Sequence, residues 1–109
     1  MVKSRDEVAR IVAEFRRRLG RIYGDRLKGL YLYGSYARGD ARDDSDIDVA
    51  VVLEGPVSCA EERWRASELV SDTALRENCL VIPFFLSVEE YRHGPFAIHR
   101  SIARAGIPV

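Results

Sequence analysis

Residues 31–53, YLYGSYARGDARDDSDIDVAVVL, place an acidic segment between two runs of β-forming residues. The first run, residues 27–34, is short and rich in leucine and tyrosine, which predicts a strand that enters the core. The second run, residues 45–53, becomes continuously apolar and predicts a second strand. Five aspartates between Asp40 and Asp48 therefore lie where this second strand begins.

Helix starts are marked on both sides of this segment. Three Ser-x-x-Glu capping boxes predict them, at Ser4 with Glu7, Ser58 with Glu61 and Ser87 with Glu90. The first helix carries apolar residues at helical spacing, and Gly20 predicts its end. Residues 36–39 predict at most a short helical turn, and residues 96–106 predict a final helix.

A third strand is predicted at residues 79–87, CLVIPFFLS. Because proline cannot donate to a ladder, Pro83 predicts that this strand lies at an edge of the sheet or carries a bulge. The resulting order is α-β-β-α-β-α-α. It predicts an α+β fold in which a small mixed β-sheet is flanked by helices, with residues 1–109 as one domain.

Charge and composition restrict the classes of function. Seventeen basic and seventeen acidic residues cancel, so no global field draws the chain to nucleic acid or to an anionic membrane. No run reaches the roughly 18 apolar residues of a membrane span, and the polar start lacks the apolar core of a signal peptide. Cys59 and Cys79 lack C-x-x-C spacing and are typical of core thiols in a reducing compartment. We therefore expect a cytoplasmic protein without direct contact to nucleic acid.

Other charged and polar residues favour ordinary interpretations. Residues 16–28 contain six bases and one acid, and we favour a solvated helix face there over a docking surface. His93 and His99 lack the spacing of metal ligands, so we expect ordinary polar positions.

The glycines around the acidic segment fit a P-loop only in part. Gly34 and Gly39 have the G-x-x-x-x-G spacing, but Asp40 and Ala41 stand where a P-loop needs lysine and a hydroxyl residue. The P-loop interpretation is therefore excluded.

The spacing of the acids is also similar to that of a calcium-binding EF-hand loop. Asp44, Asp46 and Asp48 alternate as its first ligands do. Val49 however occupies the position of its glycine, and Gly55 the position of its bidentate glutamate. An EF-hand is therefore excluded as well.

What remains is a glycine-serine turn followed by an Asp-x-Asp strand. Asp46 and Asp48 should project to one face, about 6.6 Å apart by backbone rise, while Ile47 faces the core. Two carboxylates this close repel each other, and oxygen-only ligands favour Mg²⁺ or Mn²⁺. Gly34 allows close backbone approach, and Ser35 adds a hydroxyl beside the free N–H groups of a helical turn. Metal and phosphate together indicate nucleotide chemistry.

These residues resemble the motif of the DNA polymerase β-like nucleotidyltransferases, and among them the minimal nucleotidyltransferases. That motif is Gly-Ser, ten residues, then Asp-x-Asp, and it is matched without a gap by Gly34-Ser35, residues 36–45 and Asp46-Ile47-Asp48. The predicted element order over residues 5–90 resembles the family, and so does the tail at residues 84–109.

The resemblance implies a role for each matched residue. Asp46 and Asp48 would hold two metal ions that clamp ATP, and Gly34 with Ser35 would hold its β- and γ-phosphates. Arg38 matches a basic residue of the family's turn and would steady the triphosphate. The alternative for Arg38 is an ion pair with Asp40 or Asp43 at the surface, and both interpretations stay open.

The chain departs from the family at the third carboxylate, which normally lies on the following strand. Residues 80–83 are all apolar here. Asp72 and Glu77 precede that strand and would reach the site only if the chain bent back. A general base contributes about 10²–10⁴-fold to a rate, so we expect its loss to slow transfer without abolishing it.

The expected acceptor is another protein, because the sequence shows no acceptor-binding domain. By resemblance, the partner is a HEPN-domain RNase toxin, and this chain is its antitoxin, which adds AMP from ATP to a tyrosine near the toxin's active site. Homo- or hetero-oligomers are both compatible with this function. One alternative is a domain of weak or no activity that neutralises the toxin by binding, and a less favoured one is transfer to a small molecule.

Overall fold

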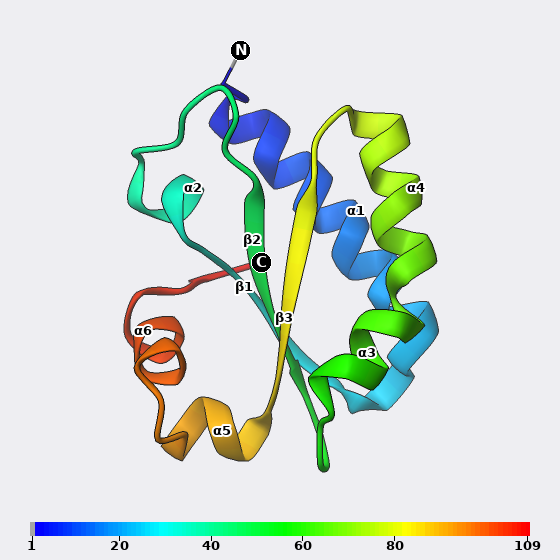
Figure 1. Ribbon diagram of the computed structural model, residues 1–109, viewed down its shortest axis with the longest axis vertical. Coiled ribbons are helices and arrows are strands. Elements are labelled where there is room, and N and C mark those ends of the chain that lie inside the picture. Colours follow the sequence, from blue (N-terminus) through cyan, green and yellow to red (C-terminus); the bar gives the residue numbers. More distant parts are fainter. Residues whose placement is uncertain (1) are drawn as a thin grey trace.

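A four-stranded mixed sheet forms the centre of the fold in the computed structural model, which describes residues 2–109 (Figure 1). The strands are β1 (Leu27–Tyr33), β2 (Ile47–Leu53), β3 (Val81–Ser87) and β4 (Ile107–Pro108), in the spatial order β3-β2-β1-β4. β2 pairs with β1 antiparallel and with β3 parallel, and β4 pairs antiparallel with β1. The predicted α+β class with a mixed sheet is confirmed.

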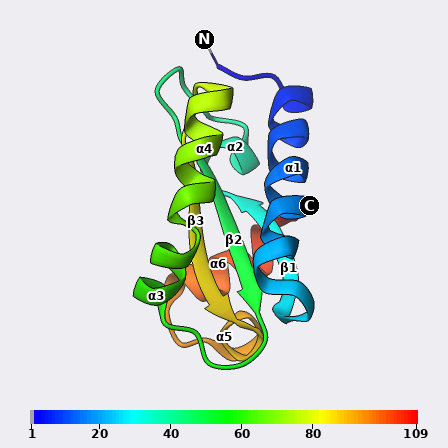
Figure 2. The same cartoon turned by 90° about the vertical axis from the view of Figure 1, so that its right-hand side faces the viewer.

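Helices lie on both sides of this sheet (Figures 1 and 2). They are α1 (Arg5–Tyr23), α2 (Ser35–Arg38), α3 (Cys59–Arg65), α4 (Ser67–Glu77), α5 (Val88–His93) and α6 (Ala97–Ala105), with a 3₁₀ turn, η1 (Gly24–Arg26), after α1. The side chains of Ser4, Ser58 and Ser87 accept the predicted backbone hydrogen bonds at the starts of α1, α3 and α5. The short turn predicted after Gly34 is α2.

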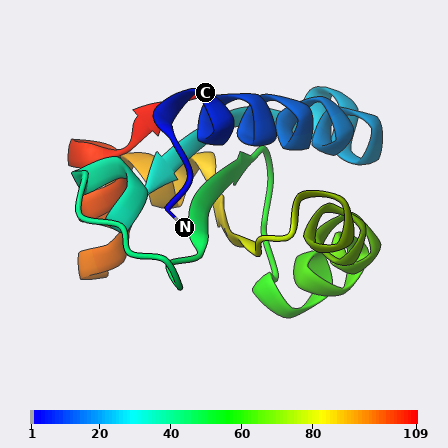
Figure 3. The same cartoon turned by 90° about the horizontal axis from the view of Figure 1, so that it is seen from above.

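The sheet separates two cores. On β2, Val49 and Val51 pack with α1, α3 and α4, whereas Ala50 and Val52 pack with α5 and α6. Seen from above, α1 and α4 lie on one side of the strands and α6 on the other (Figure 3). Successive residues of a strand therefore reach different layers. No helix among residues 2–109 is both long and apolar enough to cross a bilayer.

The structure corrects several predicted boundaries. α1 continues through Gly20, because Leu19 and Tyr23 prolong its buried stripe, and it ends at Tyr23, with Gly24 at a φ of 54° as its C-cap. The single helix expected after Ser58 is divided at the buried Ala66. At this break the hydroxyl of Ser67 donates to the carbonyl of Trp64 at 2.7 Å.

The third strand is shorter than expected at its start, since it begins at Val81. It is an edge strand, as Pro83 predicted. The thiol of Cys59 donates to the carbonyl of Phe85 on this strand at 3.2 Å. β4, which the sequence did not predict, pairs with β1, and the N–H of Val109 donates to the carbonyl of Leu30 at 2.9 Å.

Candidate active site

The turn from β1 into α2 is made by Gly34, and Asp48 determines why glycine stands there. The backbone of Gly34, with a φ of 76° and a ψ of −155°, lies in a region that residues other than glycine rarely adopt. A Cβ at this position would lie 2.3 Å from Oδ2 of Asp48 and 3.1 Å from its Cγ. The backbone of the turn and the carboxylate are therefore in direct contact.

The strand register places two further residues beside Asp48. Tyr33 of β1 and Ile82 of β3 are its partners in the two neighbouring strands. Aligned residues on adjacent strands point to the same face, so these three side chains lie in one row across the sheet. Asp48 is half-buried there, while Asp46 is exposed and precedes the first residue of β2. The strand was predicted to contain both acids, but it holds only Asp48.

Burial and a neighbouring charge make this carboxylate costly to ionise. Burial raises the pKa of Asp48, the negative charge of Asp46 raises it further, and Arg38 lowers it. Burial together with Asp48 raises the pKa of Tyr33 to about 12, so its phenol is neutral at physiological pH. A cation at the two acids would remove their mutual repulsion.

The donor set fits a hard divalent cation. Asp46 and Asp48 offer only oxygen atoms, which Mg²⁺ and Mn²⁺ prefer. Within residues 2–109 no group of three or more His, Cys, Asp or Glu side chains assembles a metal site. Mg²⁺ is commonly bound by one or two carboxylates and completed by substrate phosphates, and the exposed Asp46 with the half-buried Asp48 suits that arrangement.

The other predicted residues of the turn are Ser35 and Arg38. Ser35 is the first residue of α2, and its carbonyl accepts from the N–H groups of Gly39 at 3.0 Å and Asp40 at 3.1 Å. The Nε of Arg38 donates to Asp40 at 3.3 Å, and its side chain is 64% exposed. Pairing with Asp40 is thus observed, and a contact of Arg38 with triphosphate stays a prediction.

A cavity of about 490 Å³ borders the acidic segment. Asp43, Asp44 and Asp46 line it together with Tyr36 and Leu80. The N–H of Lys3 donates to the hydroxyl of Tyr36 at 3.4 Å and brings the start of the chain to this cavity.

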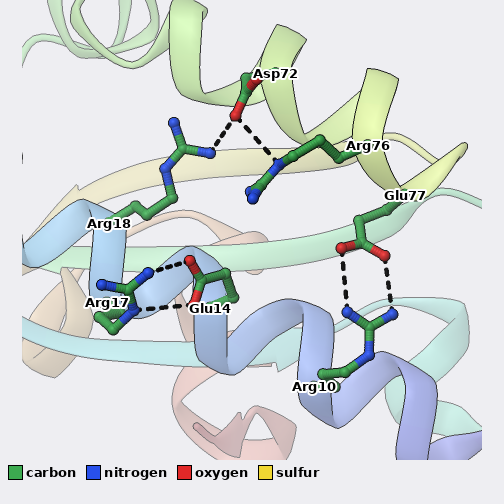
Figure 4. A network of polar contacts seen from close by, with 7 residues as sticks. All are labelled: Arg10, Glu14, Arg17, Arg18, Asp72, Arg76 and Glu77. Carbon is green, nitrogen blue, oxygen red and sulfur yellow. Dashed lines mark hydrogen bonds and ion pairs between the residues drawn. The ribbon is translucent and has the colours of Figure 1, made fainter.

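Asp72 and Glu77 are held by arginines on α1 and α4 (Figure 4). Arg10 of α1 donates to both carboxylate oxygens of Glu77, at 2.9 and 3.1 Å, and Asp72 pairs with Arg18 and Arg76. These arginine contacts lower the pKa of both carboxyls. Both acids lie between α1 and α4, in the layer opposite to the face of Asp48.

The bases of residues 16–28 were predicted to form a solvated helix face, and the same contacts show that this is true of only part of them. Arg17 pairs with Glu14 on its own helix, and Arg18 pairs with Asp72 across the helix seam. Part of this cluster therefore joins α1 to α4 in addition to facing solvent.

Sequence reasoning missed two neighbours of Asp48. Ile82 was only part of an apolar run, and the register shows that it is the residue of β3 beside Asp48. For Tyr33 the sequence predicts a place in a strand but no contact with the site.

His99, expected at an ordinary polar position, is 4% exposed, and its Nδ1 accepts from the N–H of Phe96 at 3.4 Å.

Comparison with known proteins assigns the family. The model of the nucleotidyltransferase domain matches residues 10–101. The chain belongs to this family. This nucleotidyltransferase is 31% identical over 77 residues to MJ0141 of Methanocaldococcus jannaschii, which covers 71% of this chain and 77% of MJ0141. A second protein of that organism, MJ0604, is 46% identical over 41 residues, or 38% of this chain and 41% of its own. Both are named, provisionally, as protein adenylyltransferases.

Solved structures share the fold. A protein of Sulfolobus solfataricus, provisionally named a nucleotidyltransferase, matches 99% of this chain and 89% of its own, with a TM-score of 0.68 and 21% identity. A chain of a toxin–antitoxin complex with AMP-PNP matches 87% of this chain and 69% of its own, with a TM-score of 0.59 and 24% identity. These likenesses show that the nucleotidyltransferase has the fold of both proteins.

Proposed function

We propose that this nucleotidyltransferase transfers AMP from ATP to a tyrosine of a HEPN-domain RNase toxin in the cytoplasm, and so acts as its antitoxin. The observation that carries the proposal is the contact between Gly34 and Asp48. A turn suited to phosphate and a carboxylate suited to a divalent cation meet at one point, as transfer of a nucleotidyl group requires.

Each residue of the site has a role in this proposal. Asp46 and Asp48 hold Mg²⁺ or Mn²⁺, and Gly34 with Ser35 holds the β- and γ-phosphates of ATP, which Arg38 steadies after leaving Asp40. When bound, the metal neutralises negative charge on the triphosphate. The phenolic oxygen of the acceptor forms the new bond to the α-phosphorus, pyrophosphate leaves with the electron pair of the broken bond, and the phenolic proton passes to solvent.

Two comparisons support a protein acceptor. MJ0141 is named as a protein adenylyltransferase and covers most of this chain. A structural relative is part of a toxin–antitoxin complex that holds AMP-PNP. The HEPN partner and its tyrosine are the proposed extension of these findings to this chain.

The direct test is mass spectrometry of the partner. Incubation of the cognate HEPN protein with this chain, ATP and Mg²⁺ should add the mass of one or more AMP groups, located on a tyrosine by peptide sequencing. Asp48→Asn should abolish the added mass, because the two acids hold the metal charge that stabilises the α-phosphate. Asp25→Asn, an exposed aspartate in η1, is the matched control and should transfer normally. Wild-type protein that binds the partner without adding AMP would refute the proposal.

A second candidate function is neutralisation of the toxin by contact alone. The observation that favours it is Ile82, an apolar side chain in the row with Asp48 where an acid would assist the chemistry. In that case Asp48→Asn should protect cells from the toxin as well as wild type does. The transferase proposal predicts that the same variant loses protection together with the mass shift. Transfer to a small molecule such as an aminoglycoside has no observation in its favour.

A further inference from the structure

A row of apolar side chains leads away from Asp48 along the edge strand β3. Ile82 is 38% exposed, and Phe84, two residues further, points to the same face. The ring of Phe84 lies 6.3 Å from that of His99, and the ring of Phe96, which is 66% exposed, lies 5.4 Å from that of His99. We call Ile82, Phe84 and Phe96 the apolar strip.

The strip has an acidic rim at its end beside the active site. Leu80, which is 41% exposed and precedes Ile82, lines the same cavity as Asp43, Asp44 and Asp46. An apolar surface that ends in carboxylates complements a partner with an apolar centre and basic residues on one side.

We propose that the apolar strip is the surface on which the acceptor protein docks, with basic residues of that protein against the acidic rim. This inference rests on the proposed transferase function, because an acceptor tyrosine that reaches Asp48 brings its protein over β3. Ile82 then serves docking at the position where an acid would serve chemistry. A few anchor residues near the centre of an interface, often aromatic, contribute most of its binding free energy once the partner covers them.

A second exposed apolar pair offers a matched control. Trp64 on α3 is 81% exposed and Leu75 on α4 is 85% exposed. Both helices pack on the sheet face opposite to Asp48, so a protein bound there would not bring its tyrosine to the site. Exposure alone therefore does not select the strip, but its position on the face of Asp48 does.

The test separates docking from chemistry in the full chain. Ile82→Ser and Phe96→Ser should each raise the KM for the HEPN protein roughly tenfold or more, as loss of an interface anchor does. The shift in melting temperature that ATP and Mg²⁺ produce should be unchanged in both variants. Trp64→Ser and Leu75→Ser should leave the KM unchanged. Phe96→Leu, which keeps an apolar contact, should restore most of the affinity.

The acidic rim has its own readout. Asp44→Asn should raise the KM at low ionic strength and have little effect at high ionic strength, because salt screens exposed charges. The inference is wrong if the strip variants keep the wild-type KM, or if the control variants raise it as much. It is also wrong if the strip variants abolish self-association of this chain in light scattering while binding of the partner is unchanged, since the occupant is then a second copy.

Calorimetry of the binding between this chain and the HEPN protein, without ATP, distinguishes a failure of the proposed function from a failure of the docking inference. If wild type binds the HEPN protein but transfers no AMP, the proposed function fails, and the dissociation constants of the strip variants still test the docking surface. If AMP is transferred and the strip variants bind and react normally, the docking inference alone fails.

Discussion

Replacing Gly34 by alanine should destabilise the protein in two ways, through its backbone angles and through one contact with Asp48. The backbone angles at this position cost a residue other than glycine about 1–3 kcal/mol. The new Cβ would also lie 2.3 Å from Oδ2 of Asp48, so the carboxylate must move, and overpacking of this kind costs about 1–3 kcal/mol more. Gly34→Ala should therefore lower the free energy of unfolding by about 2–6 kcal/mol.

A double-mutant cycle with Asp48→Ala separates the two contributions. Without the carboxylate the nearest remaining atom of residue 48 is its Cβ, at 3.2 Å, so only the backbone cost of about 1–3 kcal/mol should remain. The coupling free energy between the two positions should then be about 1–3 kcal/mol.

Urea unfolding of the wild type, both single variants and the double variant measures this coupling. Gly39→Ala is the matched control, because Gly39 has a similar φ of 82° but no atom near its missing Cβ. Its cost should be about 1–2 kcal/mol and independent of Asp48. An equal cost of Gly34→Ala with and without the Asp48 carboxylate would show that the contact does not explain the glycine.

Three further predictions follow from the charges and polar contacts. Because the folded-state pKa of Asp48 is raised, ionisation there opposes folding: the wild type should lose stability relative to Asp48→Asn as the pH rises above 3.8, and denaturation at several pH values measures the difference. Asp72→Asn and Glu77→Gln should transfer AMP at the wild-type rate, since both acids pair with arginines between α1 and α4; a lost mass shift would place them in the site. Tyr23→Phe should lower the unfolding free energy by about 1–3 kcal/mol, because the hydroxyl of Tyr23 donates at 2.9 Å to the buried carboxylate of Glu62, and thermal denaturation tests it.

Local signals predicted the elements well, and their limits are physical. A capping serine fixes a helix start within one turn, so the starts at Ser4, Ser58 and Ser87 were found. The end of α1 depends on burial of Tyr23 against other elements, which Gly20 could not reveal. β4 has two residues and exists only because β1 offers an open edge there.

The site shows the same division between local and distant information. The spacing from Gly34 to Asp48 located the family motif, and the contact between the two residues lies beyond sequence reasoning because it depends on how the chain between them folds. The neighbours of Asp48 on the sheet, Tyr33 and Ile82, follow from strand register, which a hydrophobic pattern does not determine for a central strand apolar on both faces.

The edge strand has a consequence for aggregation. β2, with the run VAVVL, has the composition of segments that form cross-β fibrils, and β1 and β3 enclose it from both sides. At the β3 edge of the sheet, Pro83 offers an incoming strand no N–H, and the carbonyl of Phe85 already accepts from the thiol of Cys59. Pro83 and Cys59 thus hinder a strand of another molecule from pairing with β3.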